Sequence, residues 1–291
     1  MLIATAIISG LGLGSMYGLL ALGFHVTHAV SRTVNFAQGS TMMLGAVLCF
    51  TFWVTLNWPL PVAVIVALAG CALWGVVVER VAVRPFVARG SNSWLIATVA
   101  LGIVLDNVVL FTFGKDPRGM PPGILTTGAI TLAGVRVQYL QALIPVIGLL
   151  LAAGLQALFA ASRHGKALLA VVQNRDAARL MGIRVERVIE FAFALSGLLA
   201  GIAGILVAPL FTISSTMGTL FGIKAFAVAI LGGLTNPWGV VIAGLAYGLV
   251  EACATTWLGS SSTQIVTFSV VIAALTLVPN GLFGIRTRAR L

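Results

Sequence analysis

Nine runs of apolar residues, joined by short polar connections, constrain this 291-residue sequence more than any other feature. A helix needs about 20 apolar residues to cross a hydrocarbon layer roughly 30 Å thick. With 59% hydrophobic residues and seven acidic side chains, the chain has too little polar surface for a soluble globule. We therefore predict an all-α polytopic membrane protein, a single transmembrane domain over residues 1–291 with about 8–9 transmembrane or re-entrant helices. The predicted spans are 2–24, 34–56, 60–78, 93–114, 138–161, 189–211, 223–234, 238–257 and 264–283.

Positive charge falls between these runs and sets the expected orientation. Its three clusters lie at residues 80–89, 162–187 and 286–290. Cytoplasmic loops carry an excess of Lys and Arg, so all three clusters are expected on the cytoplasmic side, facing anionic lipid or a protein partner. An outer amino terminus and an inner carboxyl terminus follow if the short seventh run, 223–234, crosses the membrane. Whether that run crosses or is re-entrant stays open.

The segment Ser162–Arg187 holds six of the seventeen Lys and Arg residues. Burying six cations would cost on the order of 15 kcal/mol, so the segment must lie outside the bilayer as a cytoplasmic loop. Its Leu, Val and Met residues recur at helical spacing, which predicts two short amphipathic helices. Asn174 and Asp176 are expected to cap the second helix, at about 175–181, and Gly182 to end it in a left-handed conformation. The loop either lies on anionic lipid or docks in a partner's groove.

Similar polar sequences precede two of the apolar runs. They are "VNFAQGSTMML" from Val34 and "LTNPWGVVIAG" from Leu234. Each places an Asn just before a turn that contains Gly and then begins a helix, so both Asn residues are predicted to act as cap or turn residues. Broken helices of this kind mark the central path of a transporter. The residues predicted to line such a path are Asn35, Gln38, Ser40, Asp106 and Asn236.

Two acids, Asp106 and Glu251, lie inside apolar runs, where a charge costs at least about 2.5–3.5 kcal/mol. Each must face the bundle interior, form a pair or be protonated. One of them can contact a substrate amine or carry protons. Alternatively, each pairs with Lys224 or Asn107, or caps broken backbone. Lys224 itself is expected to reach the membrane interface rather than bind a substrate carboxylate.

Glycines recur four positions apart in several runs, as in Gly10, Gly14 and Gly18. Gly197 with Gly201 and Gly244 with Gly248 repeat the pattern. Such rows let helix backbones pack closely, which is how helices gain contact energy in lipid.

No feature of the sequence indicates an enzyme or a cofactor site. The phosphate-binding pattern GxxxxGK[ST] is absent, and no Ser, His and Asp arrangement singles out a nucleophile. His25 and His28 lack a third metal ligand, and the three cysteines are scattered among apolar residues. The positive charge lacks the stacking aromatic residues of a nucleic-acid site. We expect no catalytic residue, no metal and no bound cofactor, with any ATP bound by partner subunits.

Five segments together resemble the LivH-type permease subunit of branched-chain amino acid ABC importers. They are "GSMYGLLALGFHVTH", "VNFAQGSTMMLGA", "VVERVAVRPF", "RHGKALLAVVQNRDAARLMGI" and "GIKAFAVAILGGLTNPWGVVIAGLAYGLVEA". The resemblance covers nearly the whole chain, and the last two segments are the most specific. It implies a LivM-type second permease, two cytoplasmic ATPase subunits and a periplasmic or extracellular solute-binding protein as partners.

The resemblance also implies roles for the loop at 162–187, which is similar to the coupling segment of importers. Its ATPase-coupling residues would be Gln173, Asn174, Arg175, Asp176 and Gly182. The sequence departs from the acidic-Ala-Ala start of importer coupling motifs, because Leu169, Ala170 and Val171 stand in that region without a carboxylate.

The expected function is half of the translocation path of an importer for branched-chain or related hydrophobic amino acids, multi-pass in a bacterial inner membrane. Related frameworks carry urea or short amides, and the sequence leaves the exact solute and a homo- or heterodimeric pairing open. A proton-coupled secondary transporter that uses Asp106 or Glu251, and a scaffold that transports nothing, are the rival hypotheses.

Overall fold

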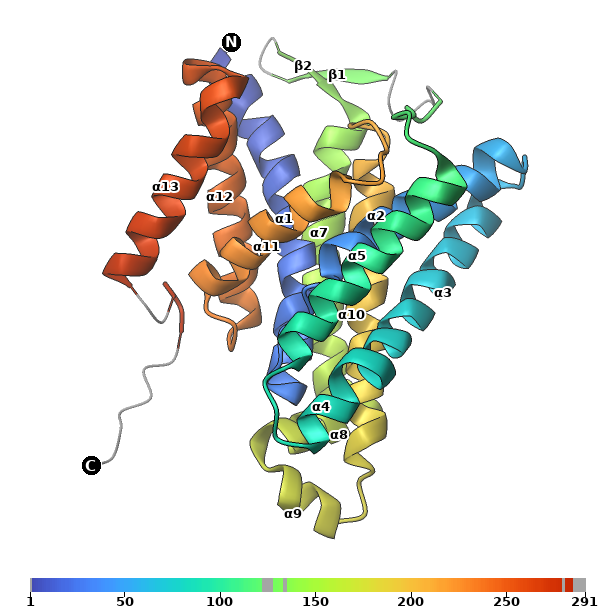
Figure 1. Cartoon of the computed structure of the whole chain (residues 1–291). Helices are drawn as coiled ribbons and strands as arrows, with labels where there is room; N and C mark the ends of the chain where they lie inside the picture. The colour runs from blue at the N-terminus through green and yellow to red at the C-terminus, as the bar shows by residue number, and fades with distance from the viewer. Residues whose placement is uncertain (1, 122–127, 133–134, 279–280, 285–291) are drawn as a thin grey trace. The chain divides into compact units, whose positions relative to one another are not determined.

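The structure, a computed structural model, describes residues 2–121, 128–132, 135–278 and 281–284. It consists of helices and one small hairpin (Figure 1). The helices are α1 (Leu2–Ser31), α2 (Gln38–Phe50), α3 (Leu60–Val78), α4 (Arg84–Ala88), α5 (Trp94–Phe113), α7 (Tyr139–Ala161), α8 (Arg163–Gln173), α9 (Arg175–Leu180), α10 (Val185–Val207), α11 (Met217–Gly232), α12 (Pro237–Leu258) and α13 (Ser260–Leu277). Strands β1 (Ala129–Leu132) and β2 (Val135–Gln138) pair antiparallel, with Ala129 opposite Gln138.

The all-α prediction is confirmed, and each of the nine predicted runs overlaps an apolar helix. Seven helical segments in the described residues are long and apolar enough to cross a membrane, and two shorter apolar helices accompany them, Met217–Gly232 and Ser262–Thr276. The short seventh run is part of α11, which begins six residues before the predicted start and has 16 residues. A helix of that length rises about 24 Å, less than the hydrocarbon thickness, so whether it crosses stays open. The arginines at 286–290 lie outside the described residues.

The helices form two compact units, each assembled from separate stretches of chain. Unit 1 comprises Met1–His25, Pro122–Ala152 and Lys224–Leu291, and unit 2 comprises Val26–Pro121 and Ala153–Ile223. Three of the four boundaries between the units fall inside helices, namely α1, α7 and α11. The single domain over residues 1–291 stays a prediction.

In unit 2, α10 packs against α2 and α3 through small residues. A Cβ atom added at Gly45 would stand 2.7 Å from the Gly201 Cα, and one added at Gly201 would stand 2.9 Å from the Cys71 Sγ. Both separations are too short for a real side chain, so glycine is required for the backbones to approach this closely.

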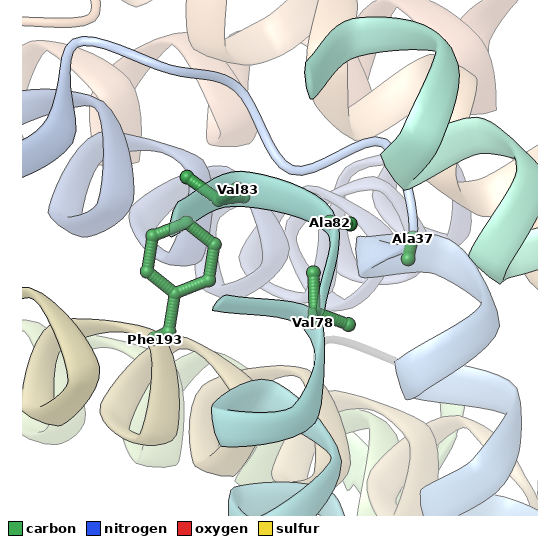
Figure 2. Close-up of a cluster of buried hydrophobic side chains, with 5 residues drawn as sticks. All are labelled: Ala37, Val78, Ala82, Val83 and Phe193. Atoms are coloured by element: carbon green, nitrogen blue, oxygen red, sulfur yellow. The ribbon is translucent and has the colours of Figure 1, made fainter. Parts of the chain in front are cut away.

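A buried apolar cluster lies where α3 gives way to α4. Figure 2 shows Phe193 of α10 beside Val83, with Val78, Ala82 and Ala37 completing the cluster. The chain between α3 and α4 is a π-helical turn, Glu79–Val83. Such turns contain one extra residue and occur often at functional sites. The cluster thus joins this turn to α10 and to the start of α2.

In unit 1, α1 packs on α12 through the predicted glycine row. A Cβ atom added at Gly14 would lie 2.6 Å from the Gly244 carbonyl oxygen, and one added at Gly10 would lie 2.9 Å from the Leu249 Cα. At Gly18 the nearest atom, the Val241 Cα, would be 3.6 Å away, which is ordinary contact. The row therefore enforces close packing at Gly10 and Gly14 but leaves room at Gly18.

This contrast yields a prediction for two matched variants. Gly14→Ala pushes α1 away from α12 and should lower the free energy of unfolding by about 1–3 kcal/mol. Gly18→Ala adds the same methyl group without a clash and should be neutral or stabilising by up to about 1 kcal/mol, because Ala favours the helix. Unfolding of the purified protein in a denaturing-detergent titration measures both. Equal stabilities of the two variants would contradict the packing described here.

Candidate functional site

The loop between α7 and α10 consists of two short capped helices, as predicted. The Ser162 hydroxyl accepts a hydrogen bond from the Gly165 N–H at 2.9 Å and caps α8. The Asn174 side chain accepts from the N–H groups of Asp176 and Ala177, both at 3.0 Å, and caps α9. Gly182 has φ +81° and ends the second helix in the left-handed region, where glycine is favoured. Asp176 lies in the first turn of α9, where its negative charge suits the helix dipole.

The two ends of this loop differ in burial. Leu168 and Val171 of α8 are buried, and Gly165 lies against the backbone of α7 at Leu158 and Phe159. At the other end, Leu180 and Met181 are 88% and 82% exposed. Two large apolar side chains so exposed on a strongly charged loop are unusual unless a partner covers them.

Two arginines of α9 tie the loop to the rest of unit 2. The Arg175 guanidinium donates a hydrogen bond to the Val30 carbonyl oxygen near the end of α1. The Arg179 guanidinium pairs with the Glu186 carboxylate in the first turn of α10, with an N–O distance of 3.0 Å. The loop is therefore held to α1 on one side and to α10 on the other.

A buried carboxylate extends this connection to the π-helical turn. Glu79 is 2% exposed, and Arg84 binds its two oxygens at 3.0 and 2.8 Å. A turn closed by i→i+5 hydrogen bonds brings residue i+5 over residue i, which explains why residues five apart meet here. Arg84 also lies 3.4 Å from the Glu190 carboxylate of α10, and Arg80 pairs with the same carboxylate. These charge-assisted bonds link α4 and the π-helical turn to α10.

The first predicted broken helix is a buried polar turn at the start of α2. The Asn35 amide donates to the Gln38 side-chain oxygen at 3.4 Å and its carbonyl accepts from the Ala37 N–H at 3.1 Å. Gln38 in turn donates to the Ser196 carbonyl oxygen on α10 at 3.1 Å and accepts from the Ser196 hydroxyl at 2.9 Å. Asn35 and Gln38 are buried, so these bonds satisfy polar groups inside the bundle.

Asp106 of α5 is partly exposed and belongs to a second set of polar contacts. Thr219 of α11 donates a hydrogen bond to its carboxylate at 3.4 Å, and Ser40 of α2 offers a second hydroxyl. A Cβ atom added at Gly102, one turn before Asp106, would lie 3.2 Å from the Ser40 Oγ, which shows how closely α2 and α5 approach. Asn107 is not the partner of Asp106, because its amide donates to the Ile103 carbonyl oxygen at 2.8 Å.

The fifth predicted path residue, Asn236, belongs to unit 1 and caps α12 as predicted. Its side-chain oxygen accepts from the Trp238 N–H at 3.1 Å and from the Gly239 N–H at 3.2 Å. Pro237 occupies the first helical position, where no N–H is needed. The structure thus brings Asn35 together with Gln38, and Asp106 together with Ser40, in two separate polar contacts of unit 2, and gives Asn236 a capping role in its own helix.

The expectation that Lys224 reaches the membrane interface is wrong. Lys224 is buried in unit 1, where its ammonium group pairs with the Glu251 carboxylate of α12 and donates to the Tyr17 hydroxyl oxygen at 3.3 Å. Tyr17 packs edge-on against Tyr247 with ring centroids 5.4 Å apart. The opposite charge of Glu251 compensates the ammonium group, so the lysine need not extend to water. Sequence reasoning named the pairing as one alternative but missed Tyr17.

This ion pair gives a second prediction. Lys224→Met leaves the Glu251 carboxylate buried without its counterion and should lower the free energy of unfolding by about 3–5 kcal/mol. The double variant Lys224→Met/Glu251→Met removes both charges with similar volume and should recover most of that loss. Denaturing-detergent titration of the three proteins measures the difference. A double variant as unstable as Lys224→Met alone would show that the pair itself supplies the stability.

Within the described residues, no three His, Cys, Asp or Glu side chains lie close enough together to hold a metal ion. Cys49 and Cys71 are buried, Cys253 is partly buried, and all three are free thiols. The geometry thus offers a charged loop of two short helices that is bonded to α1 and α10.

Comparison with known proteins finds one family whose model matches residues 6–278. Its description is "Branched-chain amino acid transport system / permease component". The chain is 30% identical over 292 residues to the high-affinity branched-chain amino acid transport system permease protein BraD of Pseudomonas aeruginosa, covering 96% of this chain and 94% of that protein. It is 30% identical to the permease protein LivH of Escherichia coli, covering 95% and 94%. It is also 30% identical to a probable LivH of Methanocaldococcus jannaschii, covering 92% and 88%.

Proposed function

Because the chain belongs to the family of permease components of branched-chain amino acid transport systems, we propose that it forms half of the translocation path of an ABC importer in the bacterial plasma membrane. Separate ATPase subunits bind the ATP, a second permease completes the path, and an outer solute-binding protein delivers the solute. The solutes are branched-chain or related hydrophobic amino acids. The family match over residues 6–278 and the apolar helices support this proposal.

The α8–α9 loop is the part of this chain that the ATPase subunits would contact. The observation that carries this assignment is the pair of exposed side chains, Leu180 and Met181, at the end of a helix whose arginines are bound to α1 and α10. An apolar end can dock in a groove, while the bound arginines transmit its displacement to the helices. Gln173, Asn174, Asp176 and Gly182 shape the loop, and Arg175 acts through its bond to Val30.

This assignment predicts the effect of removing the exposed side chains. Leu180→Ser/Met181→Ser should weaken binding of the ATPase subunits to the permease pair by at least about a hundredfold, because burial of the two side chains together contributes about 3–6 kcal/mol. Biolayer interferometry with the permease pair in nanodiscs measures the dissociation constant.

Ala177→Ser serves as the matched control, since it adds a hydroxyl to an exposed position of the same helix. It should change the affinity less than twofold. If the double variant binds the ATPase subunits as tightly as the control does, the loop is not the docking element.

The solute path would pass the Asp106 carboxylate, where α2 and α5 approach closely. A carboxylate at residue 13 of the 20-residue helix α5 is too costly for a lipid-facing position, which favours a wet path beside Asp106. Ser40 and Thr219 contact Asp106, whereas Asn35 and Gln38 bond one another and α10 at the start of α2. Asn236 would hold the corresponding helix start in unit 1. Hydroxyl and carboxylate groups suit transient contacts with a zwitterion.

Reconstitution tests the function directly. Proteoliposomes that contain the chain, its second permease and the ATPase subunits should take up leucine, isoleucine and valine only when ATP and the solute-binding protein are both present. Radiolabelled uptake with and without each component measures this. The solute range follows from competition by urea, short amides and other amino acids.

Other outcomes identify the rivals. Uptake driven by a pH gradient in vesicles that hold this chain alone would establish a secondary transporter. Saturable uptake of urea or amides with no uptake of amino acids would assign a different solute. Absence of flux for every solute, with all partners present and bound, would show that the chain is a scaffold that transports nothing.

A further inference from the structure

An open groove lies beside the α8–α9 loop, within unit 2. Its volume is about 380 Å³. One wall is the end of α1 with Ala29 and Arg32, and the other is the junction of α8 and α9. The residues from that junction are Val171, Val172, Gln173, Asn174 and Arg175. The groove therefore presents two guanidinium groups and two side-chain amides and no carboxylate.

Within the described residues, neither arginine of this groove forms an ion pair, unlike Arg84 and Arg179 next to it. The neighbouring cavity, of about 120 Å³, is lined by Glu79, Arg84, Arg179 and Glu186. Arg175 lines both cavities, whereas Arg84 and Arg179 pair with carboxylates. No described carboxylate lies within ion-pair distance of Arg32, whose side chain also has no hydrogen-bond partner among the described residues. In the part of the chain that the structure describes, the Arg175 side chain bonds only the Val30 carbonyl oxygen, which carries no formal charge.

The two guanidinium groups also repel one another. Burial lowers the pKa of Arg175 below its usual value, and the positive charges of Arg32 and Arg179 lower it further, whereas the Asp176 carboxylate opposes this shift. Two like charges held together in one groove form a favourable position for an anion, which would be attracted by both.

The backbone at Arg32 supplies independent support. Arg32 has φ +56°, a left-handed conformation that is uncommon for residues other than Gly, Asn or Asp. Such a backbone conformation persists only where the surrounding structure imposes it, and residues in such conformations cluster at binding sites. Here the conformation ends α1 and places the Arg32 side chain on the wall of the groove.

We propose that this groove binds a carboxylate side chain of the ATPase subunit that docks on the α8–α9 loop. The proposal rests on the proposed function, because it requires that subunit as a partner. Asn174 and Arg175 belong both to the groove and to the start of α9, so the groove continues the surface that ends in Leu180 and Met181. A guanidinium pair recognises a carboxylate through charge and paired hydrogen bonds. The groove thus adds an electrostatic contact to an apolar one.

The test compares three variants of the permease pair in nanodiscs of neutral phosphatidylcholine and, separately, in nanodiscs that contain anionic phosphatidylglycerol, with purified ATPase subunits as the probe. Arg32→Asn removes the guanidinium but tolerates the left-handed backbone, so the loss of charge is separated from backbone strain. Arg32→Lys keeps the charge. Arg163→Gln removes an exposed positive charge from the same loop but outside the groove. The dissociation constant is measured at low salt and at about 1 M salt, where screening is strong.

We expect Arg32→Asn to weaken binding about tenfold at low salt, Arg32→Lys to weaken it less, and Arg163→Gln to change it less than twofold. High salt should reduce the difference between wild type and Arg32→Asn. Equal effects of Arg32→Asn and Arg163→Gln would overturn the proposal. A loss that occurs only in nanodiscs with anionic phosphatidylglycerol would also overturn it, because the occupant would then be a lipid headgroup. Failure of the wild-type pair to bind the ATPase subunits would instead refute the proposed function.

Discussion

Close approach of helix backbones at small residues is the constraint on which both units depend. Lipid offers helices no hydrophobic reason to associate, so contact energy must come from van der Waals packing. In unit 2 this packing is made where α10 meets α2 and α3 at Gly45 and Gly201, and in unit 1 where α1 meets α12 at Gly10 and Gly14. Polar groups can be buried in such bundles because tight packing holds their partners within bonding distance.

Helix α10 connects the features that bear on function in unit 2. Glu186, Glu190, Phe193 and Ser196 follow one another at intervals of three or four residues, which places them on one face. They contact, in turn, Arg179 of the loop, the arginines near the π-helical turn, the cluster of Figure 2 and Gln38 of the polar turn. A displacement of the loop would therefore move the polar turn through a single rigid element.

Features set by local sequence were predicted well. The caps at Asn174 and Asn236, the end of α9 at Gly182 and the extents of most helices follow from residue chemistry within a few positions. Pairings between distant residues were harder. The burial of Lys224 depends on Tyr17 and Glu251, which lie 207 and 27 residues away, and nothing local indicates that they meet. The hydrogen bond of Arg175 to a backbone carbonyl likewise cannot be predicted from the sequence, because every residue has a carbonyl group.

The π-helical turn at Glu79–Val83 also changes how the sequence around it must be interpreted. An α-helix advances about 100° per residue, so one extra residue rotates everything beyond it by that angle relative to an uninterrupted helix. Positions before and after the turn therefore follow two different helical phases, and a single helical wheel drawn over residues 60–88 assigns the second part to the wrong face. Glu79 and Arg84 meet because of that phase shift, since residues five apart in a continuous α-helix would not face each other.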